Sequence, residues 1–471
     1  MTKLCEPYQL LSLMLGGLLL ASQAPATSDE ANVFVYHPAN ECELLYAIYQ
    51  ANTAPPTQYS IIDLSEGNVH GNIFEYNQDC ESYWQNNCNP PPSLLPDGDE
   101  ICYANKSSPN NELNALPEIY MSMTIANGRV QRSALSGTPT NFRIMSIISN
   151  NGSTPNVSLY KITVQNGKLL SAGNGGGINI LAGIVNIESS IISNNFAASD
   201  GGGIYFSGTA LNIQTSILSH NEGATGGGIA VEQLGFGTVV NSSISFNSAT
   251  GASGYGGGIF SVGNGMAIYN SKFSSNSADN GGGLYNDTAP LTVSQCTFWG
   301  NQADSDGGAI ANYDVASLTN NTIANNSATG SGGGIYNNDT IQDFVSNLVA
   351  ENTSMGGSGS GHDFFNLGTI NNESFNLIGN CDGVCGLTNG NNFDIVGSPS
   401  AQIDPGFVNG DGGELMWNGG PTETLALDAG SPAINNGDNP NNLEFDQRGP
   451  NFFRVVGARP DIGAYEVQYD F

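Results

Sequence analysis

Positive charge is what this sequence has least of. Only 11 of its 471 residues are Lys or Arg, against 42 Asp and Glu, which gives a formal net charge of −31. Between Ile178 and Asn376, Lys272 is the only Lys or Arg. Nucleic acids and anionic membrane surfaces are bound by clustered basic residues. We therefore expect no nucleic-acid partner, and we interpret the acidity as solubility in a salty exterior.

Long apolar runs are also scarce. One run extends from Leu10 to Leu20, after the basic Lys3, and a small-x-small site lies between Ala24 and Ala26. This arrangement is typical of a signal peptide, here residues 1–26, and an uncleaved anchor is the alternative. We expect no transmembrane segment after its removal. The sequence thus predicts an extracellular or cell-surface protein, secreted or on a bacterial outer membrane.

Cysteines are few, and their positions agree with export. Four of the eight lie in an N-terminal region rich in Pro and Asn, and could form two disulfides in any of three pairings: Cys42, Cys80, Cys88 and Cys102. Cys381 and Cys385 could close a small loop and are candidates for a further disulfide. Zinc is the competing interpretation, but no histidine lies nearby at ligand spacing.

Glycine, in contrast, is abundant, with 62 residues. A Gly-Gly-Gly-Ile motif or a close variant recurs every 25 to 30 residues and ends at Ile178, Ile204, Ile229, Ile259, Leu284, Ile310 and Ile335. A repeat of this length indicates a solenoid. Apolar residues alternate within short β-branched runs, which is typical of strands. We predict an all-β protein, a right-handed parallel β-helix with one repeat per coil.

A column of asparagines repeats in step with the glycines, and we predict that it forms a structural ladder of side-chain amides from coil to coil: Asn195, Asn221, Asn247, Asn276, Asn301 and Asn326. Small residues lie five positions before each of them: Ser190, Ser216, Ser242, Ser271, Cys296 and Asn321. Cys296 thus occupies a position that Ser or Asn takes elsewhere. We interpret it as a buried structural thiol and not as a nucleophile.

These patterns divide the chain into four parts. Residues 1–26 are the signal peptide, and residues 27–140 are an irregular N-terminal cap with the predicted disulfides and the first coils. Residues 141–380 are the glycine-rich repeats. Residues 381–471 are the C-terminal coils and a terminal segment, in which Val467, Tyr469 and Phe471 alternate as in a strand and predict a terminal cap.

The coils resemble the repeats of polymorphic outer-membrane proteins, with matches at Gly307–Ile310, Phe273–Asn276 and Phe298–Asn301. The C-terminal part resembles the choice-of-anchor β-helix proteins of bacteria (the Q type). The motifs that carry this second resemblance are Asn376–Gly379, Asp404–Phe407, Gly419–Thr422, Gly430–Ile434, Asp446–Gly449 and Asp461–Glu466. Residues 42–48 are similar to a degraded Cys-Ser-Leu-Arg-Glu-Ala-Ile (CSLREA) segment of related proteins. These resemblances imply export and a pectin-lyase-like β-helix, but they imply no reaction.

Catalysis has little support in the sequence. A lyase of this fold needs a basic residue beside Ca²⁺-binding carboxylates, and Lys272 is the only candidate base on the repeats. An inverting hydrolase needs two separated acids. Asp304 and Asp306 lie at the glycine corner, His220 is isolated, and Gly361-His362-Asp363 is a lone approximation to a polygalacturonase signature.

We therefore assign no catalytic, cofactor-binding or metal-binding residue, and keep weak Ca²⁺ binding by loop Asp and Asn side chains as an alternative. The predicted function is an adhesion, binding or structural scaffold that recognises glycans or envelope surfaces. A polysaccharide lyase or glycoside hydrolase of the same fold is the alternative. The oligomeric state stays open.

Overall fold

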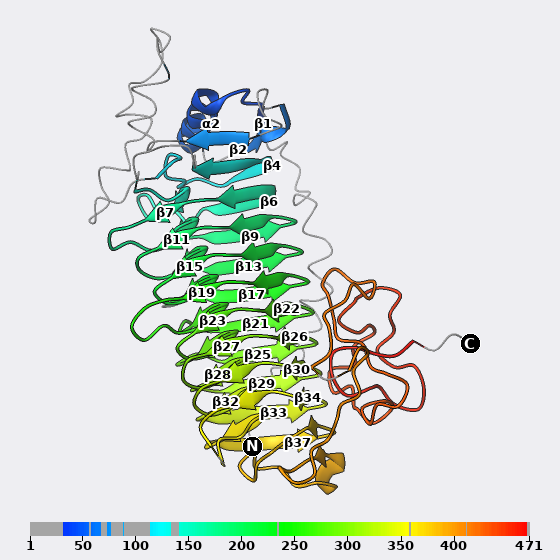
Figure 1. Cartoon of the computed structure of the whole chain (residues 1–471). Helices are drawn as coiled ribbons and strands as arrows, with labels where there is room; N and C mark the ends of the chain where they lie inside the picture. Colours follow the sequence, from blue (N-terminus) through cyan, green and yellow to red (C-terminus); the bar gives the residue numbers. More distant parts are fainter. Residues whose placement is uncertain are drawn as a thin grey trace, which may run out of the picture.

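The computed structural model describes residues 32–55, 58–66, 73–76, 88, 114–132, 141–232, 235–357, 359–410 and 412–468. The predicted signal peptide, Cys80, Cys102, Tyr469 and Phe471 lie outside these residues. The described chain forms a parallel β-helix, an elongated stack of coils that confirms the predicted fold (Figure 1). Its strands belong to three parallel sheets of 22, nine and eight strands within the described residues.

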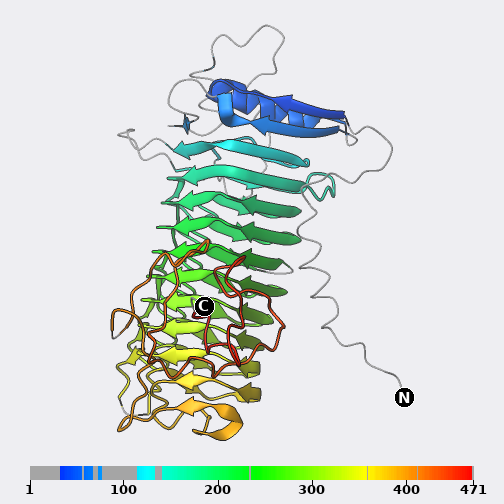
Figure 2. The same cartoon turned by 90° about the vertical axis from the view of Figure 1, so that its right-hand side faces the viewer.

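The N-terminal end of the stack is covered by a helix, which the sequence did not predict (Figure 2). Helix α2 (Glu41–Thr53) connects β1 (Asn32–Tyr36) to β2 (Gln58–Asp63) and buries Leu44, Leu45 and Ile48. Asn40 caps it by accepting a hydrogen bond from the Glu43 N–H, while the Glu43 carboxylate accepts one from the Ala39 N–H. Cys42 and Cys88 lie at disulfide distance. This part of the predicted irregular cap is therefore an ordered helix that seals the apolar core.

The first coils then follow, with η2 (Leu64–Glu66), β3 (Ile73–Tyr76), β4 (Met123–Arg132) and β6 (Asn156–Gln165). The large sheet continues with β9 (Ile184–Glu188), β10 (Ile191–Ser193), β13 (Ala210–Gln214), β14 (Ile217–Ser219), β17 (Phe236–Val240), β18 (Ser243–Ser245), β21 (Gly265–Tyr269), β22 (Lys272–Ser274), β25 (Leu291–Ser294), β26 (Thr297–Trp299), β29 (Ala316–Thr319), β30 (Thr322–Ala324), β33 (Thr340–Val345), β34 (Leu348–Ala350), β37 (Thr369–Ser374), β38 (Leu377–Ile378) and β39 (Ile395–Val396).

The nine-stranded sheet contains β5 (Met145–Ile147), β8 (Ile178–Ile180), β12 (Ile204–Phe206), β16 (Ile229–Val231), β20 (Ile259–Ser261), β24 (Leu284–Asn286), β28 (Ile310–Asn312), β32 (Ile335–Asn337) and β36 (Phe364–Asn366). The eight-stranded sheet contains β7 (Lys168–Leu169), β11 (Phe196–Ala197), β15 (Glu222–Gly223), β19 (Ser248–Ala249), β23 (Ser277–Ala278), β27 (Gln302–Ala303), β31 (Ser327–Ala328) and β35 (Thr353–Ser354).

The sequence repeat sets the register of the stack, because equivalent residues of successive repeats pair between neighbouring coils. Ile204 pairs with Ile178 on one side and with Ile229 on the other, and the column continues through Ile259, Leu284, Ile310 and Ile335. All of these side chains are fully buried. Each coil thus adds its apolar residues to one continuous core.

The glycine corner joins the eight-stranded sheet to the nine-stranded sheet, and its residues have little space. Gly281 has a φ of +64°, and a Cβ atom there would lie 2.4 Å from the Leu284 carbonyl oxygen. A Cβ atom on Gly282 would lie 2.3 Å from the Gln302 carbonyl oxygen of the next coil. Only glycine combines this conformation with so close an approach of two backbones.

The C-terminal part of the chain lies partly at the end of the stack of coils and partly along one of its sides. Residues 381–398, with η4 (Asn391–Phe393) and β39, lie at the open end of the stack. The chain then folds back, and residues 399–468 lie beside β26, β30 and β34 (Figure 1). Phe407, Leu425 and Ile462 of this lateral segment share a buried cluster with Leu348 and Leu377 of the solenoid. Val467, predicted to belong to a cap on the end, is therefore packed against the side.

Candidate functional site

The six predicted ladder asparagines lie buried in the interior, one in each of six successive coils. Each Nδ2 donates to the Oδ1 of the next asparagine at 2.8 to 3.0 Å. In each step the backbone N–H of the earlier asparagine donates to that same Oδ1. These backbone and Nδ2 donors point to the later coil in every step, so the ladder has a direction. Each Nδ2 also donates to a backbone carbonyl of the earlier coil, as from Asn276 to Ile244.

The ladder continues beyond the predicted residues through Asn352 and ends at Asp363. Asp363 Oδ1 accepts from N and Nδ2 of Asn352 at 2.8 and 2.9 Å, and its Oδ2 accepts from the Asn380 N–H. A carboxylate only accepts, so it needs no further coil. Burial raises the pKa of Asp363 to about 7, against the lowering effect of these hydrogen bonds. The Gly361-His362-Asp363 motif is thus part of the interior, and His362 Nδ1 accepts from the Ser354 N–H.

A second ladder follows the column of small residues. Backbone N–H groups donate to the side chain of the next coil, from Ser190 through Cys296 and Asn321 to Asn376. This ladder also ends on an aspartate, because Asp394 Oδ1 accepts from N and Nδ2 of Asn376. Burial raises the pKa of the Cys296 thiol to about 12, so this fully buried thiol stays protonated.

The other candidates have structural contacts. Lys272 Nζ lies 2.5 Å from Glu423 Oε2 of the lateral segment. Asp306 Oδ1 accepts from the Ser331 N–H at 2.7 Å, and the Asp304 side chain is exposed. The His220 ring stacks on Phe246 with centroids 5.0 Å apart. Cys381 and Cys385 lie at disulfide distance. Among the described residues, no three His, Cys, Asp or Glu side chains are grouped to hold a metal ion.

A stripe of aromatic side chains follows the outer face of the nine-stranded sheet. Neighbouring rings along the stripe have centroids 4.5 to 6.1 Å apart, and the members are Tyr255, Phe260, Tyr285, Tyr313, Tyr336 and Phe365. Phe260, Tyr285, Tyr336 and Phe365 each occupy the middle position of a strand. Tyr313 lies between Tyr285 and Tyr336, where the strand itself carries Ala311. The rings therefore form one continuous stack.

The surroundings of this aromatic stripe are acidic. Burial is the largest cause that raises the pKa values of the three hydroxyls. Asp287 adds to it at Tyr285 and Asp306 at Tyr336, while at Tyr313 the neighbouring tyrosines contribute ahead of Asp306. The hydroxyls stay protonated at neutral pH and can donate hydrogen bonds. The lateral segment lies beside β26, β30 and β34 of the large sheet, whereas the stripe belongs to the nine-stranded sheet (Figure 1).

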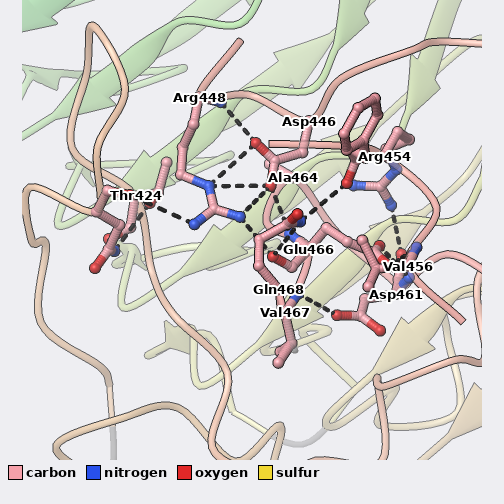
Figure 3. A network of polar contacts seen from close by, with 12 residues as sticks. Thr424, Asp446, Arg448, Arg454, Val456, Asp461, Ala464, Glu466, Val467 and Gln468 are labelled. Carbon is pink, nitrogen blue, oxygen red and sulfur yellow. Dashed lines mark hydrogen bonds and ion pairs between the residues drawn. The ribbon is translucent and has the colours of Figure 1, made fainter. Parts of the chain in front are cut away.

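The lateral segment is held together by a buried charged network (Figure 3). Arg448 pairs with Asp446, and its guanidinium lies 4.1 and 4.0 Å from the ring centroids of Phe452 and Tyr465. The Glu466 carboxylate accepts from the N–H groups of Val456 and Asp461, and burial raises its pKa to about 8. The motif residues at 446–449 and 461–466 thus have a structural role.

The fold and this surface define the class of protein, a parallel β-helix with a half-buried aromatic stripe and acidic residues on one outer face. Residues 189–207 match the model of the Chlamydia polymorphic membrane protein repeat. No curated protein and no solved structure matches the chain. The matched residues contain Ile192, Asn195 and Ile204, which supply one member to each of three columns of the stack.

This repeat indicates a bacterial surface or outer-membrane β-helix protein. The resemblances to choice-of-anchor proteins and to the CSLREA segment receive no support from the comparisons. In the described part of the chain, no helix has the length and apolarity needed to cross a membrane.

The aromatic stripe was not predicted, although its signal is in the sequence. The residue directly after the Gly-Gly-Gly-Ile or Gly-Gly-Gly-Leu motif is aromatic in several coils: Tyr205, Phe260, Tyr285 and Tyr336. An outward position on a strand follows an inward one. Extending the repeat by one residue would have placed these rings on the outer face.

Proposed function

We propose that the protein is a surface-exposed binding scaffold and not a polysaccharide-cleaving enzyme, and that its contact face is the outer face of the nine-stranded sheet. The observation that supports this is the aromatic stripe. It offers ring edges and protonated Tyr hydroxyls at a spacing set by the stack of coils. Many weak contacts at a regular spacing bind a repetitive partner strongly through multivalency.

The chemistry favours an uncharged partner. Asp287 and Asp306 beside the stripe, together with the net charge of −31, repel polyanions such as pectate or alginate. Tyr hydroxyls and carboxylates form hydrogen bonds with sugar hydroxyls, and ring edges pack against the apolar parts of a sugar. A neutral glycan of an envelope or matrix is therefore the proposed partner.

The test is adhesion of the purified full chain to insoluble neutral polysaccharides, compared with the variant Tyr313→Ser/Tyr336→Ser. We expect at least tenfold weaker adhesion of the variant. Trp417→Ser is the matched control, because Trp417 is 69% exposed and lies on the lateral segment. Equal adhesion of all three proteins would contradict the proposal.

The enzyme alternative makes a different prediction. If it holds, the protein with Ca²⁺ will release unsaturated or reducing sugar ends from pectin or alginate. The double variant Asp304→Asn/Asp306→Asn will then abolish this release without unfolding the chain. Both results together would show that the protein is an enzyme and would contradict the scaffold proposal.

A further inference from the structure

A pocket of about 290 Å³ lies at the C-terminal end of the stack, where the last full coil meets η4. It is lined by Asn371, Asn372 and Glu373 of β37, by Phe375 after that strand, and by Asn392 and Phe393 of η4. None of these residues belongs to the aromatic stripe. The pocket is of the size that holds one small ligand group.

Two phenylalanine rings form one wall. Phe375 and Phe393 stack with centroids 4.7 Å apart and an interplanar angle of 4°. Both residues have positive φ values, +58° and +64°. Phe375 shares this conformation with the equivalent residue of the preceding coils, such as Asn320 and Ser346, so its backbone follows the regular corner of the solenoid. Phe393 is 64% exposed, although an apolar ring of this size is ordinarily buried.

One face of the Phe393 ring is open. Its inner face is covered by Phe375, and no solenoid strand after β39 lies beyond it in the described residues. The Arg459 guanidinium lies 4.8 Å from the Phe375 centroid and 5.1 Å from the Phe393 centroid. These two distances nearly equal the ring separation, so Arg459 lies beside the stacked pair. It therefore leaves the outer face of Phe393 uncovered.

The polar wall has amides with spare hydrogen-bonding capacity. Asn392 Nδ2 donates to Glu373 Oε1 at 2.8 Å, Asn371 Nδ2 to Gln342 Oε1 at 3.0 Å, and Asn372 Nδ2 to Asp343 Oδ1 at 3.1 Å. Each bond lies in an exposed position and uses one of the two N–H donors of its amide. The second N–H and the amide oxygen remain to pair with a ligand.

We propose that this pocket binds one sugar unit of a neutral glycan. The C–H face of a pyranose packs on the electron-rich open face of Phe393, and its hydroxyls pair with the amides of Asn371, Asn372 and Asn392 and with the Glu373 carboxylate. This inference rests on the proposed glycan-binding function and adds a second contact, at the end of the solenoid. The stripe would hold the length of a polymer, and the pocket would hold a single unit.

The experiment uses the full chain and soluble probes. Binding of cellotriose, maltotriose, triacetylchitotriose and trigalacturonate is measured by saturation-transfer NMR and titration calorimetry. We expect at least one neutral trisaccharide to bind, and Phe393→Gly to weaken it at least tenfold, because glycine removes the platform and accepts the positive φ. Glu373→Gln should weaken it less, since it keeps one acceptor. Trp417→Gly is the matched control for an exposed aromatic residue elsewhere.

The outcomes separate the two proposals. Binding of trigalacturonate alone, or neutral binding that is unchanged in Phe393→Gly, would overturn the pocket as a neutral sugar site. The pocket proposal is also overturned if no trisaccharide binds. If adhesion to insoluble polysaccharide still depends on Tyr313 and Tyr336 in that case, the scaffold proposal stands. Failure of both trisaccharide binding and polymer adhesion would overturn both.

Discussion

Replacing Asn276 by Ala should remove a large part of the stability of the solenoid. Asn276 is fully buried, and its side chain takes part in four hydrogen bonds. Oδ1 accepts from N and Nδ2 of Asn247, both at 3.0 Å, and Nδ2 donates to the Ile244 carbonyl and to Asn301 Oδ1, both at 2.9 Å. At a net ~0.5–1.5 kcal/mol each, the free energy of unfolding should fall by ~2–6 kcal/mol.

The matched control is Asn186→Ala. Asn186 also connects three coils, because its Nδ2 donates to Asn156 Oδ1 at 3.1 Å and its Oδ1 accepts from Asn212 Nδ2 at 2.9 Å. These bonds lie on the outer surface, where water replaces a lost partner. We expect a loss of less than ~1 kcal/mol.

Urea unfolding followed by circular dichroism gives the two losses. Hydrogen exchange adds a local readout, because the Asn247 N–H donates to Asn276 Oδ1 and should lose protection in Asn276→Ala. Equal losses in the two variants, or unchanged protection of the Asn247 N–H, would refute the interpretation of the ladder as an interior network.

Three further predictions concern other buried groups. Cys296 should resist thiol reagents at pH 8 until the chain unfolds, as read by mass spectrometry of its peptide, and Cys296→Ser should change stability by less than ~1 kcal/mol because Ser occupies this position in the preceding coils; labelling of the folded protein would contradict this. The raised pKa values of Asp363 and Glu466, about 7 and about 8, mean that their protonated forms stabilise the fold fully below their unfolded values of 3.8 and 4.5, and that this contribution is lost as pH rises through the folded values. The melting temperature should therefore fall between pH 5 and pH 9, and less so in Glu466→Gln; a melting temperature that rises over this range would show that the carboxyls are not held protonated. Glu423→Gln should leave Lys272 without its ion pair, cost ~1–3 kcal/mol in packing of the lateral segment, and speed proteolysis within residues 399–468 but not within the coils; unchanged cleavage would mean that this pair does not hold the segment.

Much of the solenoid could be predicted because the sequence repeat contains the information on coil length and strand register. One inward Ile per coil and the glycine corner give the coil length and the register, as the pairing of Ile204 with Ile178 and Ile229 shows. The Asn column was found in the same way, up to Asn326. Asn352 follows Asn326 by 26 residues and could have been found by extending the column one coil further. The last step to Asp363 could not, because only 11 residues separate Asp363 from Asn352 and because the terminal residue is an acid.

The parts outside the repeat could not be predicted from periodicity. Helix α2 occurs once, and its burial of Leu44 and Ile48 depends on the coil beneath it. The described residues of the lateral segment form isolated β-bridges and no regular strand. Its position depends on contacts such as Thr297 Oγ1 with Gln447 Oε1, which are 150 residues apart in sequence. The pocket at Phe393 likewise combines β37 and η4, which are separated by residues 375–390 with β38 and the Cys381–Cys385 loop.

Because both ladders have the same direction, the coils are expected to gain their interior hydrogen bonds in order, from the N-terminal to the C-terminal end. Each coil presents buried N–H groups that are satisfied only by the side chain of the coil made after it. A chain that emerges N-terminus first therefore gains its interior hydrogen bonds one coil at a time, and every intermediate length exposes a reactive edge of open donors. Asp363 and Asp394 end the two ladders, because each accepts the last two donors through its Oδ1. The two aspartates therefore mark the positions, near the C-terminal end of the stack, at which this coil-by-coil gain of interior hydrogen bonds ends.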